Sequence, residues 1–224
     1  MTISDQQRLK IEVAKAAVAE VPAGAILGVG TGSTVDCFID ELARAKIKLQ
    51  AAVSSSRRTT ERLTALGYTV IGLEALAGPM DLYIDGADEI DSNLCMIKGG
   101  GGALTQEKIV ASAARRFICI VDASKRVEVL GRFPLPLEVI TAAIPSVSWA
   151  VRALGGEPSL RPGVMTDNGH PILDVRGLTI HDPKALETAL NQIPGIVTNG
   201  IFALRPADLA LVASNQGVIR LQHK

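Results

Sequence analysis

The segment KGGGGALTQEKIVA, residues 98–111, holds residue types that a proton-transfer site needs. Four consecutive glycines lose much backbone entropy on folding, which a purely structural turn does not require, so we expect a ligand to approach this backbone closely. Lys98 supplies a positive charge just before the glycines, and Glu107 falls in the first turn of a helix that Thr105 is expected to cap. Glu107 is therefore a candidate general base. The plainer alternative is a glutamate that stabilises the helix dipole beside an exposed lysine.

A second segment, DGADEID, concentrates four carboxylates within seven residues after the apolar run DLYI. Such a cluster is compatible with three roles: binding Mg²⁺, binding sugar hydroxyls, or forming a solvated acidic turn. Asp85 directly follows the apolar run, so its carboxylate is expected to be partly removed from water. This position favours hydroxyl binding and acid–base chemistry over a solvated turn.

The segment GVGTGSTV places glycines and hydroxyl residues between an expected strand and an expected helix. Glycines let backbone N–H groups approach an anion, and a helix N-terminus adds partial positive charge, so the pattern indicates a phosphate site at Thr31, Gly32, Ser33 and Thr34. The alternative is a tight turn in which Ser33 is the helix N-cap. Position 33 is not glycine and no Walker lysine follows, so the loop is not a nucleotide fingerprint and we expect the substrate to carry the phosphate.

Two lysines and three histidines complete the candidate residues. Lys125 follows the run FICIV, and Lys10 lies on an N-terminal helix from which it is expected to reach the same site. The three histidines, His170, His181 and His223, show no ligand spacing. We therefore expect neither a metal site nor a cofactor.

Composition points to a soluble protein with a small-molecule partner. The 23 basic and 23 acidic residues cancel, and no basic stripe suggests a nucleic acid or a membrane surface. The three cysteines are isolated from one another among apolar neighbours, which is typical of reduced thiols in a reducing compartment. The N-terminus is amphipathic, with Leu9, Val13, Ala16, Ala17 and Val21 on one helical face, and has no signal-peptide core. We expect a cytoplasmic protein.

The elements that must position these residues form an alternating pattern. Near-continuous apolar strands separated by helices are typical of a parallel sheet covered on both faces, so we predict a Rossmann-like open, mostly parallel sheet. Ligands of such folds bind beyond the carboxyl ends of the strands. The expected strands are 25–30, 49–54, 81–85, 95–99 and 117–121, with helices at 33–45, 57–66 and 105–115. Each strand is followed by a polar or glycine-rich loop, so five loops should meet at one edge.

The pattern changes after about residue 131. Strand and helix signals follow in the order β-α-β-β-α-β, including a helix that begins at Asp182-Pro183. We predict a small ferredoxin-like α+β domain at 131–203, inserted into a Rossmann-like catalytic domain made of 1–130 and 204–224.

The order of these motifs resembles type A ribose-5-phosphate isomerase over nearly the whole chain. The resemblance implies a homo-oligomer, most simply a dimer, that interconverts ribose 5-phosphate and ribulose 5-phosphate in the pentose phosphate pathway without a cofactor. The matching segments are GVGTGSTV, SSSRRTT, YIDGADEID, KGGGGALTQEKI, FICIVDASK, FPLPLEV, TDNGHPILDV and IPGIVTNGIF.

The resemblance also implies roles for individual residues. It makes Glu107 the base that moves a proton between C2 and C1, Asp85 an acid–base group in ring opening, and Lys98 the cation that stabilises the enediolate oxygen. The implied substrate contacts are Thr31, Gly32, Ser33, Thr34, Asp85, Gly86, Ala87, Asp88, Lys98, Gly99, Gly100, Gly101, Lys125 and Lys10.

The chain departs from the family pattern at Arg57 and Arg58, where the effect is either on phosphate affinity or on oligomer contacts, and at Cys37 and Phe38. Two other functional classes stay open. A sugar-phosphate-binding regulatory module would share the phosphate loop but would not need Glu107 with Lys98. A CoA-transferase or an amino-sugar-phosphate deaminase would use a carboxylate differently on a related scaffold.

Overall fold

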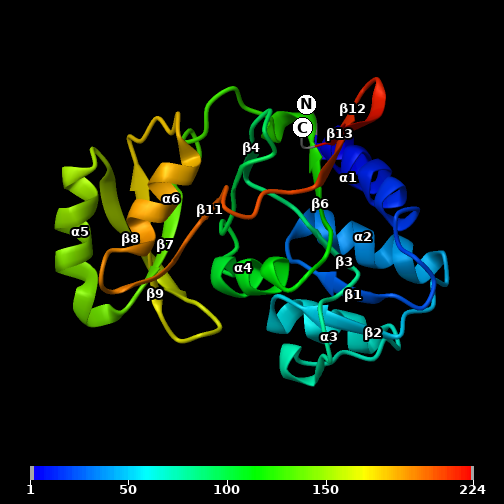
Figure 1. Cartoon of the computed structure of the whole chain (residues 1–224). Coiled ribbons are helices and arrows are strands. Elements are labelled where there is room, and N and C mark those ends of the chain that lie inside the picture. The colour runs from blue at the N-terminus through cyan, green and yellow to red at the C-terminus, as the bar shows by residue number, and fades with distance from the viewer. Residues whose placement is uncertain (1–2, 223–224) are drawn as a thin grey trace. The chain divides into compact units, whose positions relative to one another are not determined.

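The computed structural model describes residues 3–222, and contacts between Cα atoms divide the chain into two compact units (Figure 1). The first unit comprises 1–86, 106–125 and 207–224, and the second comprises 87–105 and 126–206. This division assigns 87–105, 126–130 and 204–206 to the second unit, whereas the predicted domain boundaries place them in the first. No helix of residues 3–222 is long and apolar enough to cross a membrane.

A six-stranded sheet of order β13-β12-β6-β3-β1-β2 forms the centre of the first unit. All neighbouring strands are parallel except β13, which pairs antiparallel with β12. Its strands are β1 (Ile26–Val29), β2 (Ala51–Ser54), β3 (Leu82–Asp85), β6 (Phe117–Asp122), β12 (Leu209–Ser214) and β13 (Gly217–Gln222). The predicted Rossmann-like, mostly parallel sheet is confirmed. Since β1 lies between β2 and β3, the chain order reverses at β1 and β3, which is where such folds bind ligands.

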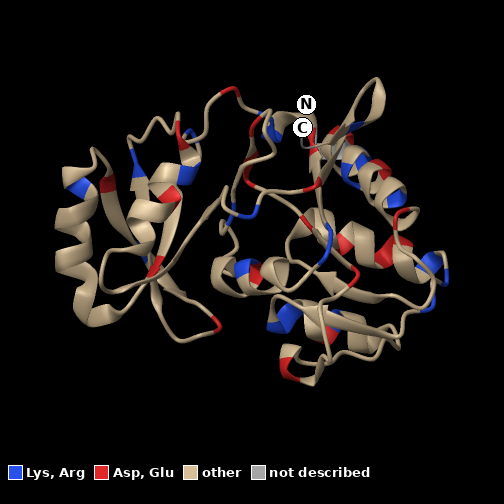
Figure 2. Cartoon of the chain, viewed as in Figure 1, with Lys and Arg blue, Asp and Glu red and all other residues tan. Residues whose placement is uncertain are grey.

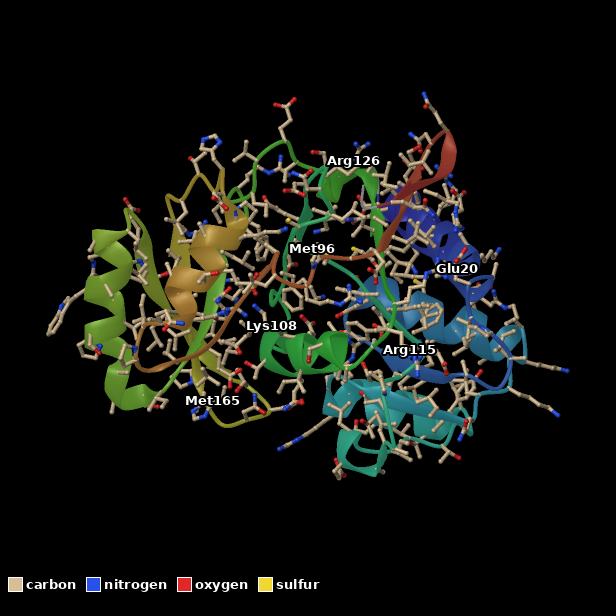
Figure 3. The ribbon with its side chains drawn as sticks, in the orientation of Figure 1. Glu20, Met96, Lys108, Arg115, Arg126 and Met165 are labelled. Atoms are coloured by element: carbon tan, nitrogen blue, oxygen red, sulfur yellow. The ribbon has the colours of Figure 1, made fainter. Side chains whose placement is uncertain are left out.

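Four helices accompany this sheet: α1 (Ile3–Val18), α2 (Ser33–Arg44), α3 (Arg57–Ala65) and α4 (Leu104–Ser112), whose first two residues cluster with the second unit. The predicted apolar face of α1 is confirmed, because Leu9, Val13 and Ala17 are fully buried in a core that includes residues of α2, β1 and β3. Just beyond α1, Glu20 (Figure 3) binds Arg116 and Arg220 of the same unit.

The opposite face of the sheet packs against α4. Leu82 and Ile84 of β3 join the α1 core, so the alternation of a strand turns Tyr83 and Asp85 to the other face. A Cβ atom built on Gly28 of β1 would lie 2.9 Å from Tyr83 and 3.1 Å from Val110 of α4. Glu107 precedes Val110 by three residues and therefore shares its face of the helix.

The second unit contains an antiparallel sheet of order β10-β7-β9-β8, and α5 and α6 lie in the chain order β-α-β-β-α-β. The predicted ferredoxin-like connectivity is therefore observed, and Asp182 caps α6 by accepting a hydrogen bond from the Ala185 N–H group. The elements are β7 (Leu135–Val139), α5 (Ile144–Ala153), β8 (Glu157–Met165), β9 (Pro171–Arg176), α6 (Pro183–Asn191) and β10 (Ile196–Asn199). Met165, at the end of β8, is labelled in Figure 3.

The predicted strand at 95–99 does not join the central sheet. Its two strand residues, β5 (Met96–Ile97), pair antiparallel with β4 (Glu89–Ile90) and β11 (Ile201–Phe202) in a three-stranded sheet of the second unit. A parallel pairing needs a crossover of about a dozen or more residues, usually helical, and the short 86–95 segment instead turns back at Leu94, whose φ is +59°. The expectation that five loops meet at one edge of a single sheet is therefore wrong for the glycine loop.

All three cysteines are buried, and burial raises the pKa of the Cys95 thiol to about 11. Positive and negative side chains are interspersed within each unit, as expected from the zero net charge (Figure 2).

Candidate active site

Asp85 ends β3 with its side chain completely buried and surrounded by donors. One carboxylate oxygen accepts hydrogen bonds from the N–H groups of Thr31, at 3.1 Å, and Gly86, at 2.7 Å. The other accepts a hydrogen bond from the Tyr83 hydroxyl. The carboxylate thus links the ends of the two strands at which the sheet order reverses, β1 and β3.

Gly30 makes room for this carboxylate. A Cβ atom at position 30 would lie 1.9 Å from Oδ1 of Asp85 and 2.6 Å from its Cβ. No side chain fits there unless Asp85 moves. The glycine before the phosphate loop is therefore required by the position of Asp85.

Tyr83 donates a hydrogen bond to Asp85 and is also influenced by the charge of Glu107. Its side chain is fully buried, and its pKa is raised well above the ordinary value by burial first, then by the charges of Asp85 and Glu107. The phenol therefore stays protonated near neutral pH and acts as a fixed donor. Because both charges act on this phenol, Asp85 and Glu107 belong to one electrostatic environment on the α4 side of the sheet.

Glu107 lies in the first turn of α4, as predicted, and only 4% of it is exposed (Lys108, the next residue, is labelled in Figure 3). Thr105 does not cap this helix, because α4 already begins at Leu104. The Thr105 hydroxyl instead donates to the buried carboxylate of Glu138. Because Glu107 is almost completely buried, its carboxylate has little contact with water, which suits a base that must act on a carbon acid.

The loop at 31–34, predicted to bind phosphate, begins α2 without a side-chain cap. Gly32 is the N-cap of α2 with φ +103° and no side-chain hydrogen bond, and Ser33 is the first helical residue, so the alternative of Ser33 as N-cap is wrong. The Ser33 hydroxyl accepts a hydrogen bond from Nζ of Lys10 at 2.9 Å, and Thr31 accepts one from Ser56 at 3.2 Å. Thr34 is half-buried. The helix N-terminus, its hydroxyls and one lysine therefore lie together.

Lys125 lies at the same edge of the sheet. It ends a short 3₁₀ turn, Ala123–Lys125, that directly follows β6, the neighbour of β3. Arg58, whose effect the sequence left open, pairs with Asp36 of α2, so it ties α3 to α2.

In the second unit, the glycine loop is held by its own neighbours. Gly99 has φ +103°, and a Cβ atom there would lie 2.9 Å from Leu104; a Cβ atom on Gly100 would lie 2.7 Å from Asp88. The Gly100 N–H group donates to Asp88 at 2.8 Å. Neighbouring side chains therefore exclude a Cβ atom at Gly99 and Gly100, whereas Gly101 has open space around it, and the approach of a ligand to this loop stays a prediction.

Lys98 precedes this loop and is almost completely buried. Its Nζ atom lies 5.5 Å from the centre of the Phe202 ring, and its backbone N–H group donates to Gly200 at 2.9 Å. A cation over an aromatic face is stabilised by the negative face of the ring.

Two acidic residues of the DGADEID segment have structural roles. Glu89 accepts hydrogen bonds from the N–H groups of Gly131, at 2.9 Å, and Phe133, at 2.7 Å. Asp91 accepts them from Asn93 and Cys95, both at 2.8 Å. Within the part of the chain that the structure describes, no group of three or more His, Cys, Asp or Glu residues could hold a metal ion, and His223 lies outside that part.

Sequence reasoning missed two residues of this region, Tyr83 and Arg161. Tyr83 stands two residues before Asp85 on the same strand, so the period of two could have placed both side chains on one face. Arg161 stands more than sixty positions from the glycine loop that it contacts, and nothing local in the sequence indicates it.

Comparison with known proteins gives matches over most of the chain. Residues 51–217 match the family model described as Ribose 5-phosphate isomerase A (phosphoriboisomerase A). A curated relative from Bordetella bronchiseptica, named Ribose-5-phosphate isomerase A, is 56% identical over 98% of both chains.

Solved structures agree with this match. A ribose 5 phosphate isomerase A structure from Neisseria gonorrhoeae has 43% identity and a TM-score of 0.96 over 98% of each chain. A D-ribose-5-phosphate isomerase structure in complex with phospho-erythronic acid has 35% identity and a TM-score of 0.93, covering 99% of this chain and 100% of the other.

Proposed function

The chain belongs to the ribose 5-phosphate isomerase A family, and we propose that its catalytic base is Glu107. It is an aldose–ketose isomerase that interconverts ribose 5-phosphate and ribulose 5-phosphate. The assignment of this reaction rests on the 56% identity over almost the full length of the chain. The burial of Glu107 and its electrostatic influence on Tyr83 support the role of Glu107 as the base. The regulatory module, CoA-transferase and deaminase alternatives are not favoured.

The reaction removes a proton from C2 of the open-chain aldose and returns one to C1. Glu107 takes the C2 proton, the electrons move to the carbonyl oxygen, and a cis-enediolate forms. The same carboxylate, on one face of this planar intermediate, then protonates C1, and the proton of the O2 hydroxyl passes to O1 so that the carbonyl forms at C2. A single buried base suffices because both carbons present the same face to it.

Asp85 serves ring opening in this proposal. The sugar phosphate is mainly cyclic in solution, so a group must move a proton between the anomeric hydroxyl and the ring oxygen before C2 can react. The Asp85 carboxylate is held in place by Thr31, Gly86 and Tyr83, so it meets the sugar in one orientation. Orientation of this kind lowers the barrier because less entropy is lost at the moment of reaction.

Lys98 stabilises the developing enediolate oxygen in this proposal, and Asp88 and the glycine loop contact the sugar. Electrostatic stabilisation of a developing oxyanion is usually the largest catalytic contribution. Phospho-erythronic acid, bound by one of the similar proteins, joins a phosphate to a planar carboxylate that resembles an enediolate. This likeness supports a site that recognises a phosphate at one end and an oxyanion at the other.

The direct test of function is to incubate the purified protein with ribose 5-phosphate and to follow ketose formation. We expect ribulose 5-phosphate to accumulate to its equilibrium fraction without added cofactor. A folded protein that forms no ketose would contradict the assignment.

Lys125→Ala is expected to weaken phosphate binding more than chemistry. Losing one charge-assisted contact of about 1.5 kcal/mol should raise KM for ribose 5-phosphate about tenfold while kcat changes little. Initial rates over a range of substrate concentrations check this. The opposite pattern, a lowered kcat at constant KM, would place Lys125 in the chemistry instead.

Lys10→Ala tests whether Lys10 belongs to the phosphate site. Because its Nζ atom holds Ser33 at the start of α2, we expect KM to rise by about 3- to 10-fold. Lys15→Ala is the matched control, since Lys15 lies on the same helix and is exposed. Equal KM values for the two variants would remove Lys10 from the site.

The native protein is proposed to be a cytoplasmic homo-oligomer, most simply a dimer. This proposal comes from the family resemblance and the predicted reduced thiols. Light scattering coupled to size-exclusion chromatography gives the oligomer mass, and a mass equal to one chain at working concentration would contradict it.

A further inference from the structure

Arg161 of β8 reaches the glycine loop through a side chain that is only 15% exposed. Its Nη1 atom donates to the carbonyl oxygens of Gly99, at 3.1 Å, and Gly100, at 3.2 Å. All of these residues belong to the second unit. One guanidinium nitrogen therefore holds two consecutive peptide carbonyls of the loop.

Asp174 of β9 fixes the orientation of this guanidinium. Its two carboxylate oxygens accept hydrogen bonds from Nε at 2.8 Å and from Nη2 at 2.6 Å. A bidentate pair of this kind sets the plane of the arginine fork, which leaves Nη1 aimed at the loop. A lysine has no fork and cannot bind Asp174 bidentately while it reaches two carbonyls.

The loop is held on its other side by Asp88, which accepts the Gly100 N–H group at 2.8 Å. The Gly102 N–H group closes a turn onto the Gly99 carbonyl at 3.0 Å. Consecutive glycines have an unusually broad choice of backbone conformations, so a loop of this composition needs such restraints to keep one. Arg161 and Asp88 together fix the direction of the peptide groups.

We propose that Arg161 is a positioning residue for isomerisation: with Asp174 it holds the carbonyls of Gly99 and Gly100, and so fixes the loop that follows Lys98. The inference rests on the proposed role of Lys98 and the glycine loop in stabilising the enediolate. Arg161 acts through the loop: it keeps Lys98, Asp88 and the Gly101 peptide in one conformation.

The first test is Arg161→Ala, assayed for conversion of ribose 5-phosphate. We expect kcat to fall by about 10- to 100-fold, the size of effect that follows from a displacement of about 1 Å, with a smaller change in KM. Millimolar guanidinium chloride, far below denaturing concentrations, should restore part of the lost kcat, because the free cation can occupy the emptied place between Asp174 and the carbonyls. If Arg161 had a purely structural role, guanidinium would not restore kcat.

Arg176→Ala is the matched control, since Arg176 lies on β9 and is exposed, and it should retain wild-type kcat.

Two further variants keep the inference testable if Arg161→Ala does not fold. Arg161→Lys preserves the positive charge but not the planar fork. We expect its kcat to fall, because an ammonium group cannot replace the guanidinium group. Asp174→Asn preserves shape and weakens the bidentate pair, and we expect a smaller loss. The double variant, Arg161→Lys with Asp174→Asn, should lose no more than about the larger single loss, because the two residues act as one unit.

Lys98→Ala separates failure of this inference from failure of the proposed function. If Lys98→Ala loses activity while folded Arg161 variants keep wild-type kcat, the inference is wrong and the role of Lys98 stands. If both keep wild-type kcat, the loop has no part in catalysis and both proposals are overturned. A lowered kcat in Arg161→Ala that guanidinium partly restores, with Arg176→Ala unaffected, supports the inference.

Discussion

Glu107→Gln is expected to lower kcat for ribose 5-phosphate by about 10²- to 10⁴-fold with KM nearly unchanged. Glutamine has the shape of glutamate and can sit at the same place in the first turn of α4, but it cannot accept the C2 proton. Substrate binding is expected to persist because the phosphate loop and Lys98 are untouched. Steady-state kinetics on the purified variant give both parameters.

Glu107→Asp and Glu61→Gln are the controls for this result. Glu107→Asp keeps a carboxylate, but its side chain is one methylene shorter, so the carboxylate lies farther from the substrate. Its kcat should therefore lie between those of the wild type and the glutamine variant. Glu61 is exposed on α3, and its replacement should leave kcat unchanged. A wild-type kcat in Glu107→Gln would show that another group removes the proton.

Gly30→Ala is expected to be nearly as damaging, although it adds only one methyl group. The new Cβ atom would lie 1.9 Å from Oδ1 of Asp85, which is completely buried and has no room to yield without leaving its donors. We expect kcat to fall by about 10²-fold or more, because a displacement of about 1 Å at a reacting group costs that much. Overpacking should also lower the free energy of unfolding by about 1–3 kcal/mol.

Gly78→Ala is the control for Gly30→Ala. Nothing lies within 4 Å of a Cβ atom at position 78, and the residue has no positive φ, so both kcat and stability should be retained. Normal kcat in a Gly30→Ala variant that is destabilised would mean that the exact position of Asp85 is not needed for turnover. That result would remove Asp85 from ring opening.

The central part of the fold followed directly from the sequence. Apolar strands such as 25–30 and 117–121, each followed by a helical segment or a polar loop, predicted the parallel sheet, and the structure has β1 and β6 there. The position of Asp85 directly after an apolar run predicted a carboxylate partly removed from water, and the structure buries it completely.

Long-range pairing was not predictable in the same way. The run at 95–99 has strand-like composition, yet it pairs with 201–202, more than one hundred residues away, rather than with the central sheet. The glycine run led us to expect the close approach of a ligand, and the structure shows that the side chains of Leu104 and Asp88 also leave no room for a Cβ atom at Gly99 and Gly100. Composition indicates that a backbone is crowded but does not say by what.

Contacts of single side chains were the least predictable. Ser33 and Thr105 are residue types that cap helices, but Ser33 accepts a hydrogen bond from Lys10 and Thr105 donates one to Glu138. At the start of α2, Gly32 is the N-cap and makes no side-chain hydrogen bond. Capping propensity is a local preference, and a distant partner of the right polarity overrides it.

The most direct test of Glu107 as the catalytic base is exchange of the C2 hydrogen of ribose 5-phosphate with solvent in D₂O, followed by NMR in the wild type and in Glu107→Gln. We expect the wild type to incorporate deuterium at C2 of the aldose and C1 of the ketose, and we expect Glu107→Gln to slow this exchange by about 10²-fold or more, in parallel with kcat. Exchange at the wild-type rate in Glu107→Gln would contradict it, because a different base would then be forming the enediolate.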